Sequence, residues 1–436
     1  MKNINYKKRL IDGKLKTYLE TFGAVCIEGP KWCGKTWTCK QAAESEFEVA
    51  DPIGNFQNRH LAEIDPSAIL EGKTPRLIDE WQEVPAIWDA VRFDVDQSET
   101  VGKYLLSGSS TPKRKGIHHS GAGRIARLRM NTMSLYESGK SSGIVSLATL
   151  VDNPPKATLT GEVQLANLAD YIVTGGWPVQ FKIKSTINGS LLAKEYLEAT
   201  ITDDMNRLED KKRDIEKMKR LVRSLARNES TTASIKLLKK DMENADGRGL
   251  DEDTIADYLD VLNRMFMLSD QMPFSTNVRS STKIKQSPKR HFTDPSIPCS
   301  LLGLTKKSLI GDLNTFGFLF EALCERDMRI YAESIDAKLY HYQDYSNKEI
   351  DAVVQYQDGR WGAFEIKLGA NQIDAAAENL LKIKKEFEED NKAIPPTFLC
   401  VICGMSNSVY TRPDGVIVIP CLLYTSPSPR DATLSR

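Results

Sequence analysis

Residues 29–36 read Gly-Pro-Lys-Trp-Cys-Gly-Lys-Thr and follow the apolar run 24–27. The spacing is that of a phosphate-binding loop, G-x-x-x-x-G-K-[ST], which joins a buried strand to a helix. Its glycines let backbone N–H groups turn toward phosphate oxygens. The lysine reaches the β and γ phosphates, and the hydroxyl ligates Mg²⁺. The stretch therefore predicts a nucleoside triphosphate site in an α/β fold; the alternative is a surface turn.

The flanking residues agree with a strand over 23–28 and a helix over 35–44. The N-terminus of that helix adds its positive dipole end to the site. Lys35 is also a candidate catalytic residue, and Thr36 is a candidate Mg²⁺ ligand. The candidate nucleotide ligands are Gly29, Pro30, Lys31, Trp32, Cys33, Gly34, Lys35, Thr36 and Trp37.

An acidic pair ends a second expected strand, in the stretch PRLIDE at 75–80. Asp79 follows two aliphatic residues, which is the position of a Mg²⁺-binding acid in P-loop enzymes. Glu80 comes next and can polarise a water for attack on the γ phosphate. The pair favours hydrolysis over binding alone; the alternative is a solvated acidic turn.

A third strand, in KYLLSGSS at 103–110, ends in hydroxyl side chains. Ser109 is the candidate sensor that hydrogen-bonds the attacking water or the γ phosphate, and Ser107 is the alternative. In the basic stretch that follows, Arg124 is a candidate arginine finger, acting within its own chain or across a subunit interface. Alternatively, Arg124 and Arg127 are exposed strand positions.

The resemblance to a known family rests on five stretches: GPKWCGKT, PRLIDEWQEVPAIWDAVR, LLSGSS, HSGAGRIARLRMNTMSLYESG and YIVTGGWPVQ. Together they resemble a bacterial and archaeal family that joins an AAA-type ATPase domain to a C-terminal domain of unknown function. The resemblance extends to about residue 420. It implies binding of ATP with Mg²⁺ and, by analogy with AAA+ enzymes, hydrolysis, but it supplies no substrate. Many relatives have Thr where this chain has Ser107, which keeps the hydroxyl.

Residues 195–270 change to helical periodicity. We expect helices over 195–207, 214–228 and 233–243, and a fourth that Asp251 or Asp253 caps. A pair of strands with a basic turn over 279–290 follows. This order is typical of a winged helix, which usually binds duplex DNA.

The charges in this region leave two interpretations open. The basic turn could follow DNA phosphates. The candidate recognition helix would repel them, because it carries five acidic residues: Asp251, Glu252, Asp253, Asp257 and Asp260. The alternative to DNA binding is a lid and connector that packs on the ATPase domain.

Residues 291–420 return to an α/β pattern with the D…(D/E)-x-K signature of restriction-endonuclease-like folds. Glu365 and Lys367 share one face of a strand, and Asp351 on the neighbouring strand can reach the same point. Two carboxylates there could hold Mg²⁺ while the lysine positions a water. Glu321 resembles the additional helical acid of that fold. The alternatives are an exposed charged strand, or an inactive scaffold that binds nucleic acid or a partner.

The chain has 436 residues, with 59 Lys+Arg and 59 Asp+Glu, so the net charge gives no sign of a nucleic-acid partner and any basic surface must be local. No apolar run approaches a membrane span, and sparse cysteines favour a cytoplasmic location. Candidate partners are ATP, DNA, another protein or a second copy. We expect an α/β ATPase domain over 1–190, a winged-helix-like module over 191–290 and a nuclease-like α/β domain over 291–420. Residues 421–436 resemble a translated sequencing-adapter fragment or a disordered tail.

Overall fold

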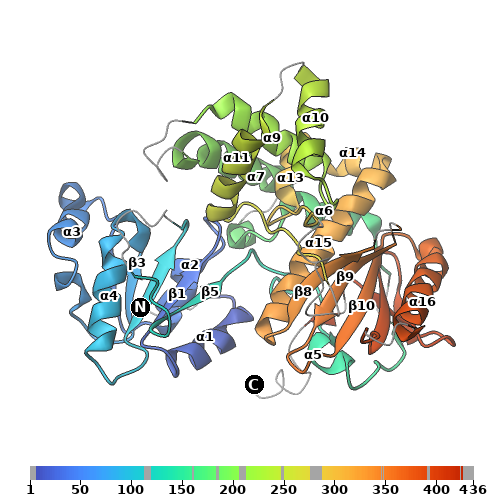
Figure 1. Ribbon diagram of the computed structural model, residues 1–436, viewed down its shortest axis with the longest axis horizontal. Helices are drawn as coiled ribbons and strands as arrows, with labels where there is room; N and C mark the ends of the chain where they lie inside the picture. Colours follow the sequence, from blue (N-terminus) through green and yellow to red (C-terminus); the bar gives the residue numbers. More distant parts are fainter. Residues whose placement is uncertain are drawn as a thin grey trace.

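The computed structural model describes residues 6–111, 119–159, 162–182, 186–205, 213–246, 250–274, 287–344, 346, 348–389, 393–422 and 424–425. Figure 1 shows three bodies: an N-terminal α/β body, a helical body above it, and a C-terminal α/β body beside both. Among the described helices, none combines the length and apolar character that crossing a membrane requires.

The N-terminal body is built on a five-stranded parallel sheet in the order β2-β3-β4-β1-β5. Its strands are β1 (Ala24–Glu28), β2 (Ser45–Glu48), β3 (Arg76–Asp79), β4 (Tyr104–Gly108) and β5 (Ile125–Arg129). The runs 24–27 and 104–106 are fully apolar because parallel strands are covered on both faces. The predicted parallel α/β sheet is confirmed. Since all five strands point the same way, their carboxyl ends share one edge.

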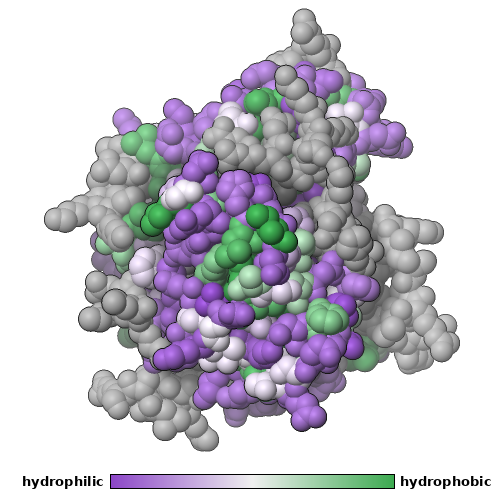
Figure 2. Space-filling model, turned by 90° about the vertical axis from the view of Figure 1, so that its left-hand side faces the viewer, coloured by the Kyte–Doolittle hydropathy of each residue, from purple (hydrophilic) through white to green (hydrophobic). Residues whose placement is uncertain are grey.

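Alternating strand residues form a core on each face of this sheet. Cys26 contributes to the core under α3 (Ile53–Ile64) and α4 (Ala86–Asp96). Val25 contributes to the core under α1 (Ile11–Leu19) and α2 (Lys35–Ala42). Short 3₁₀ turns η1 (Ala68–Leu70) and η2 (Trp81–Glu83) complete the body. Figure 2 shows its outer side as largely hydrophilic, with hydrophobic side chains gathered near the centre.

The helical body contains α6 (Leu165–Thr174), η3 (Pro178–Lys182), α7 (Thr186–Ala199), a π-helical turn η4 (Thr200–Asp204), α9 (Ile215–Arg227), α10 (Ile235–Asp246), α11 (Glu252–Arg264), α13 (Ser296–Leu301) and α14 (Lys306–Gly311). The Asp251 side chain caps α11 by accepting from Thr254 N. Antiparallel bridges then join Leu268 to Phe292 and Gln271 to Lys289. Helices α9, α10 and α11 thus precede a ribbon of isolated bridges, and the winged-helix interpretation stays a prediction. Most of the predicted basic turn, residues 279–286, lies outside the described residues.

The C-terminal body has a seven-stranded sheet in the order β7-β12-β13-β11-β10-β9-β8. Its strands are β7 (Thr158–Leu159), β8 (Lys338–Gln343), β9 (Glu349–Gln355), β10 (Trp361–Lys367), β11 (Phe398–Cys403), β12 (Ser408–Thr411) and β13 (Ile417–Pro420). Strand β10 is antiparallel to β9 and parallel to β11. Helix α15 (Leu313–Ser334) packs on one face and α16 (Ile373–Glu389), preceded by η5 (Ala370–Gln372), on the other.

The boundaries of the three bodies differ from those expected. Residues 135–163 leave the N-terminal body and, together with one face of α6, pack into the core under α15. Phe292 and Ile297 belong to the core of the helical body, so the C-terminal body does not begin at 291. The strand β6 (Val145–Ser146), followed by α5 (Leu147–Leu150), pairs with β14 (Tyr424–Thr425).

The start of the expected tail is therefore part of the fold. Tyr424 is buried, and its hydroxyl donates to Cys324 O at 3.2 Å. Ser142 N donates to Leu422 O at 2.9 Å. The ordered C-terminal body thus continues past Pro420, and residues 426–436 lie outside the described part.

Candidate nucleotide-binding site

The loop over 29–36 follows β1 and leads directly into α2. Gly34 has φ +105°, which favours glycine, and it precedes the first residue of α2. A Cβ on Gly29 would lie 2.0 Å from Met130 O, so that position has no space for a side chain. Glycine is thus required at the two positions for different steric reasons: a positive φ at Gly34 and a close backbone contact at Gly29. The backbone can therefore turn as a phosphate-binding loop must.

Lys35 is the first residue of α2 and is buried. Its Nζ donates to Gly29 O at 3.0 Å and to Pro30 O at 2.9 Å. The ammonium group of Lys35 therefore lies on the loop itself and is hydrogen-bonded to two of the loop's carbonyl oxygens. A phosphate entering the loop would exchange these neutral acceptors for charged ones, which form stronger hydrogen bonds.

Thr36 and Asp79 meet across the gap between α2 and β3. Thr36 Oγ1 donates to Asp79 Oδ1 at 3.0 Å, and Ser107 Oγ donates to the same carboxylate. Burial raises the pKa of Asp79, although the bonds from Ser107 and Thr36 oppose that rise. A hydroxyl and a carboxylate this close fit the oxygen ligands that Mg²⁺ requires. Ser107 is thus a partner of Asp79 and not a free sensor.

Glu80 and Ser109 lie side by side at the same sheet edge. Ser109 Oγ donates to Glu80 Oε2 at 3.1 Å. Gln82 Nε2 donates to the same carboxylate oxygen and, at 3.3 Å, to Ser109 Oγ. Glu80 itself has φ +56°, so the backbone turns directly after β3 and redirects its side chain. The sequence reasoning missed Gln82, two positions after Glu80, which the turn brings back onto the carboxylate.

Arg124 lies at the opposite end of the sheet from the phosphate loop. Its carbonyl accepts from Ala24 N at 3.0 Å, beside the first residue of β1, whereas the loop follows the last. Five strand residues span roughly 16 Å. Arg124 Nε donates to Asp96 Oδ1 at 2.6 Å, and half of its side chain is exposed. The structure therefore does not bring Arg124 to the phosphate loop of its own chain.

Arg127, on β5, also contacts other residues of the N-terminal body. Its guanidinium stacks on the Trp88 ring at 4.3 Å from the centroid and donates to the Glu28 carboxylate. The side chain remains partly exposed. These contacts fit the alternative interpretation, in which Arg127 is a surface strand position.

Arg9 is a buried contact of the loop that the motif search missed. Its Nη1 donates to Cys33 O at 2.8 Å, and its Nη2 donates to Asn131 O at 2.8 Å. Its Nε lies 3.1 Å from Glu137 Oε1. One guanidinium therefore joins the phosphate loop to the segment 131–138. The only sequence signal was a basic N-terminus, which does not single out Arg9 from its lysine neighbours.

Aromatic side chains border the other side of the loop. Trp32 has φ +64° and is half exposed, with its ring centroid 5.8 Å from that of Tyr196 on α7. The Tyr196 ring in turn lies 4.7 Å from Trp177. Pro178 approaches to 3.5 Å from the place where a Cβ of Gly34 would stand. The loop therefore touches the helical body directly.

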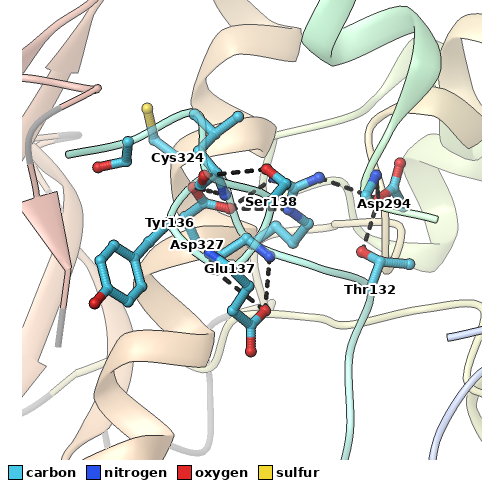
Figure 3. A network of polar contacts seen from close by, with 12 residues as sticks. Thr132, Tyr136, Glu137, Ser138, Asp294, Cys324 and Asp327 are labelled. Atoms are coloured by element: carbon cyan, nitrogen blue, oxygen red, sulfur yellow. Dashed lines mark hydrogen bonds and ion pairs between the residues drawn. The ribbon is translucent and has the colours of Figure 1, made fainter. Parts of the chain in front are cut away.

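Figure 3 shows how segment 131–138 continues to the other bodies. Thr132 Oγ1 donates to Asp294 Oδ2 at 2.7 Å. Leu135 N donates to Asp327 Oδ2, on α15, at 3.0 Å. Arg326 contacts both of these carboxylates, at 3.2 Å and 2.7 Å. A continuous network of buried polar contacts therefore runs from the phosphate loop to the helix under the C-terminal sheet.

The C-terminal acids and lysine also converge. Lys367 Nζ lies 2.9 Å from Asp351 Oδ2 and 2.6 Å from Glu365 Oε2. The carboxylate of Glu321 faces the same cluster from α15, but it meets the ammonium group of Lys289, which the sequence reasoning missed. Asn379 Nδ2 donates to Glu365 Oε1 at 2.8 Å.

The pKa values in this cluster reflect burial and the two lysines. Burial raises the pKa of Glu321 and of Glu365 to about 8. Burial also opposes ionisation of Asp351, yet Lys289 and Lys367 outweigh it and hold the pKa of Asp351 below its usual range. In the described part of the chain, no group of three or more His, Cys, Asp or Glu residues is arranged to hold a metal ion.

Comparison with known proteins assigns the N-terminal body. Residues 21–139 match the family model of an AAA domain. Two further matches are to domains of unknown function, DUF8612 over residues 165–308 and DUF4143 over residues 316–424. These ranges follow the helical and C-terminal bodies.

Similar whole chains add context to the AAA domain. Uncharacterized proteins of Mycobacterium tuberculosis and Mycobacterium bovis are each 23% identical over 369 residues, which cover 83% of this chain and 74% of theirs. A solved Walker-type ATPase of Pyrococcus abyssi shares 13% identity at a TM-score of 0.40. That alignment covers 69% of this chain and 99% of the other.

Proposed function

We propose that this protein is a Mg²⁺-dependent ATPase of AAA type. The observation that carries the proposal is the pair of contacts at one sheet edge, Thr36 with Asp79 and Ser109 with Glu80. The first pair supplies oxygen ligands for Mg²⁺, and the second holds a carboxylate beside them. A site that only binds phosphate has no need of the second pair.

Each residue then has a role in phosphoryl transfer. The backbone of the loop and Lys35 bind the β and γ phosphates. Thr36 and Asp79 would hold Mg²⁺, which neutralises charge on the phosphate oxygens when bound. Glu80 orients the attacking water, and Ser109 and Gln82 fix the direction of its carboxylate. Arg124 can assist only a neighbouring chain, since its own loop lies at the other end of the sheet.

We further propose that the nucleotide state controls the helical and C-terminal bodies. Two contacts of the loop support this proposal: Trp32 lies against Tyr196 of the helical body, and Arg9 joins Cys33 to segment 131–138. A shift of the loop on phosphate binding would move both contacts. The same contacts favour a second candidate function, a switch in which ATP binding alone changes the affinity for a protein partner.

The test is phosphate release by the purified full-length chain with Mg²⁺ and ATP. We expect Lys35→Ala to lose ATP binding, and Glu80→Gln to keep binding while losing turnover. Glu83→Gln is the matched control, because Glu83 lies in the same turn and its partly exposed carboxylate pairs with the partly exposed Arg59. Unchanged turnover in Glu80→Gln would contradict hydrolysis by this site and leave the partner-binding switch.

A further inference from the structure

Lys289 lies in the middle of the C-terminal carboxylate cluster, although it belongs to the ribbon of the helical body. Its Nζ is 2.8 Å from Glu349 Oε1 and 3.5 Å from Asp351 Oδ1, and it contacts the Glu321 carboxylate. Only 2% of its side chain is exposed. The bridge to Gln271 fixes its backbone. A lysine is almost never buried this deeply unless it is paired.

The two lysines divide the cluster between them. Lys367 contacts Asp351 Oδ2 while Lys289 faces Asp351 Oδ1, so both oxygens of Asp351 face an ammonium group. Lys367 also contacts Glu365. Buried charges of this kind persist only with close partners of opposite sign. Each of the four carboxyl groups, Glu321, Glu349, Asp351 and Glu365, therefore has an ammonium group of this chain as a close partner.

A divalent metal does not fit this arrangement. Mg²⁺ binds carboxylate oxygens at about 2.0–2.1 Å and Ca²⁺ at about 2.3–2.6 Å, with four or more further ligands around the ion. The space beside Asp351 Oδ1, Glu321 and Glu349 is taken by the Lys289 ammonium. A metal could enter only after that group left. Lys289 thus fills the space between Glu321, Glu349 and Asp351, while Lys367 lies between Asp351 and Glu365.

We propose that Lys289 is the resident cation of this cluster and that it excludes divalent metals. The contact fastens the ribbon of the helical body to α15 and β9 of the C-terminal body. The cluster is then a docking site for a lysine side chain, and it performs no metal-dependent phosphodiester cleavage while Lys289 is in place. Removing the Lys289 ammonium creates a divalent-cation site from Glu321, Glu349 and Asp351.

The experiment measures Mn²⁺ binding to the nucleotide-free full-length chain by electron paramagnetic resonance. An Asp79→Asn background removes the metal ligand of the N-terminal site. We expect no Mn²⁺ bound at the cluster in that background, and one bound ion per chain after Lys289→Met. The ion should be lost again when Asp351→Asn is added. Lys306→Met is the control, since Lys306 is a partly exposed lysine paired with Asp170.

Two results would overturn the proposal. The first is Mn²⁺ binding to the chain that keeps Lys289, if Asp351→Asn abolishes that binding. This comparison does not depend on whether a Lys289 variant folds. The second is absence of Mn²⁺ from a Lys289→Met chain with native circular dichroism. Lys289→Arg gives a further check, because it keeps the cation: Mn²⁺ binding to Lys289→Arg at the same site would also contradict the proposal.

Discussion

Arg9 Nη1 donates a 2.8 Å hydrogen bond to Cys33 O, inside the phosphate loop. The same guanidinium faces Glu137, whose other carboxylate oxygen accepts from Ser134 N at 2.9 Å. The N-terminal segment therefore fixes the loop and the exit from β5 with one side chain. The side chains of Arg9 and Glu137 are both buried, so a shift of the phosphate loop or of segment 131–138 would disturb their contact.

Replacing Arg9 should destabilise the protein strongly. Arg9→Ala leaves Glu137 buried without its partner, and breaking a buried pair costs about 3–5 kcal/mol. Chemical denaturation should show this loss, with weaker ATP binding in the chain that remains folded. The control is Lys8→Ala, since Lys8 is exposed. Equal midpoints for Arg9→Ala and the control would show that the pair contributes no net stability.

The two serines after β4 should have separable effects on catalysis. Ser109 contacts Glu80, so Ser109→Ala should lower kcat by roughly 10-fold or more with little change in KM for ATP. Ser107 contacts Asp79, so Ser107→Ala should raise the Mg²⁺ concentration needed for half-maximal activity. Steady-state kinetics at several Mg²⁺ concentrations distinguish them. Identical profiles for the two variants would contradict the separate roles.

Trp32 should report nucleotide binding by its fluorescence. It lies in the loop, is half exposed and contacts Tyr196, so a phosphate that shifts the loop changes its surroundings. We expect ATP to change the emission of the wild-type chain and of Trp37→Phe, and the change to disappear in Trp32→Phe. Trp37 is an equally exposed control in the adjacent helix. An unchanged signal in Trp32→Phe would show that Trp32 is not its source and would contradict this prediction.

Arg124→Ala should leave the turnover of a monomeric chain unchanged. An arginine finger contributes roughly 10³–10⁵ in kcat, and Arg124 is too far from its own loop to do so. The measurement is kcat at concentrations where light scattering shows a monomer. A large loss there would contradict the described position of Arg124. A loss only at concentrations where the chain associates would support action on a neighbouring chain.

Acid should destabilise the protein in part through His341. Burial, together with the nearby Lys289, lowers the pKa of His341 to about 4, from about 6.5 in an unfolded chain. Between these values the unfolded state binds the extra proton, so stability falls as the pH decreases from about 6.5 to 4. The shift corresponds to at most roughly 3 kcal/mol.

The comparison for His341 is the free energy of unfolding of the wild type and of His341→Gln across this pH range. The carboxylates of the neighbouring cluster are present in both proteins, so their opposite contribution largely cancels in the difference. We expect the wild type to lose more stability than the variant as the pH falls. A constant difference between pH 7 and pH 4 would show that His341 does not titrate as described.

The nucleotide site was the part most open to prediction, because its residues lie at strand ends within short motifs. Asp79 follows an apolar strand, and parallel strands bring their carboxyl ends to one edge, so its meeting with Thr36 followed from the pattern. Arg9 could not be found in this way. Its partner Asn131 lies far along the chain, and no local spacing records the contact.

Two other features could not be predicted from the sequence: the buried position of Lys289 and the pairing of two very short strands. Lys289 reads as a surface lysine in a basic turn, and only the fold shows the three carboxylates around it. Strands β6 and β7 have two residues each, too few for any alternation of apolar and polar positions. These strands attach residues 135–163 to the C-terminal body, and no local pattern in the sequence records that attachment.

The pairing of β6 with β14 also limits how early the middle of the chain can fold during synthesis on the ribosome. The N-terminal body is synthesised before the other two, and all five strands of its sheet lie within residues 24–129. Strands β6 and β7 and helix α6 emerge next, before their partners α15, β12 and β14, which begin at residue 313. During that interval their apolar side chains lack their final cover, so nascent chains should depend on chaperones more than the finished protein does.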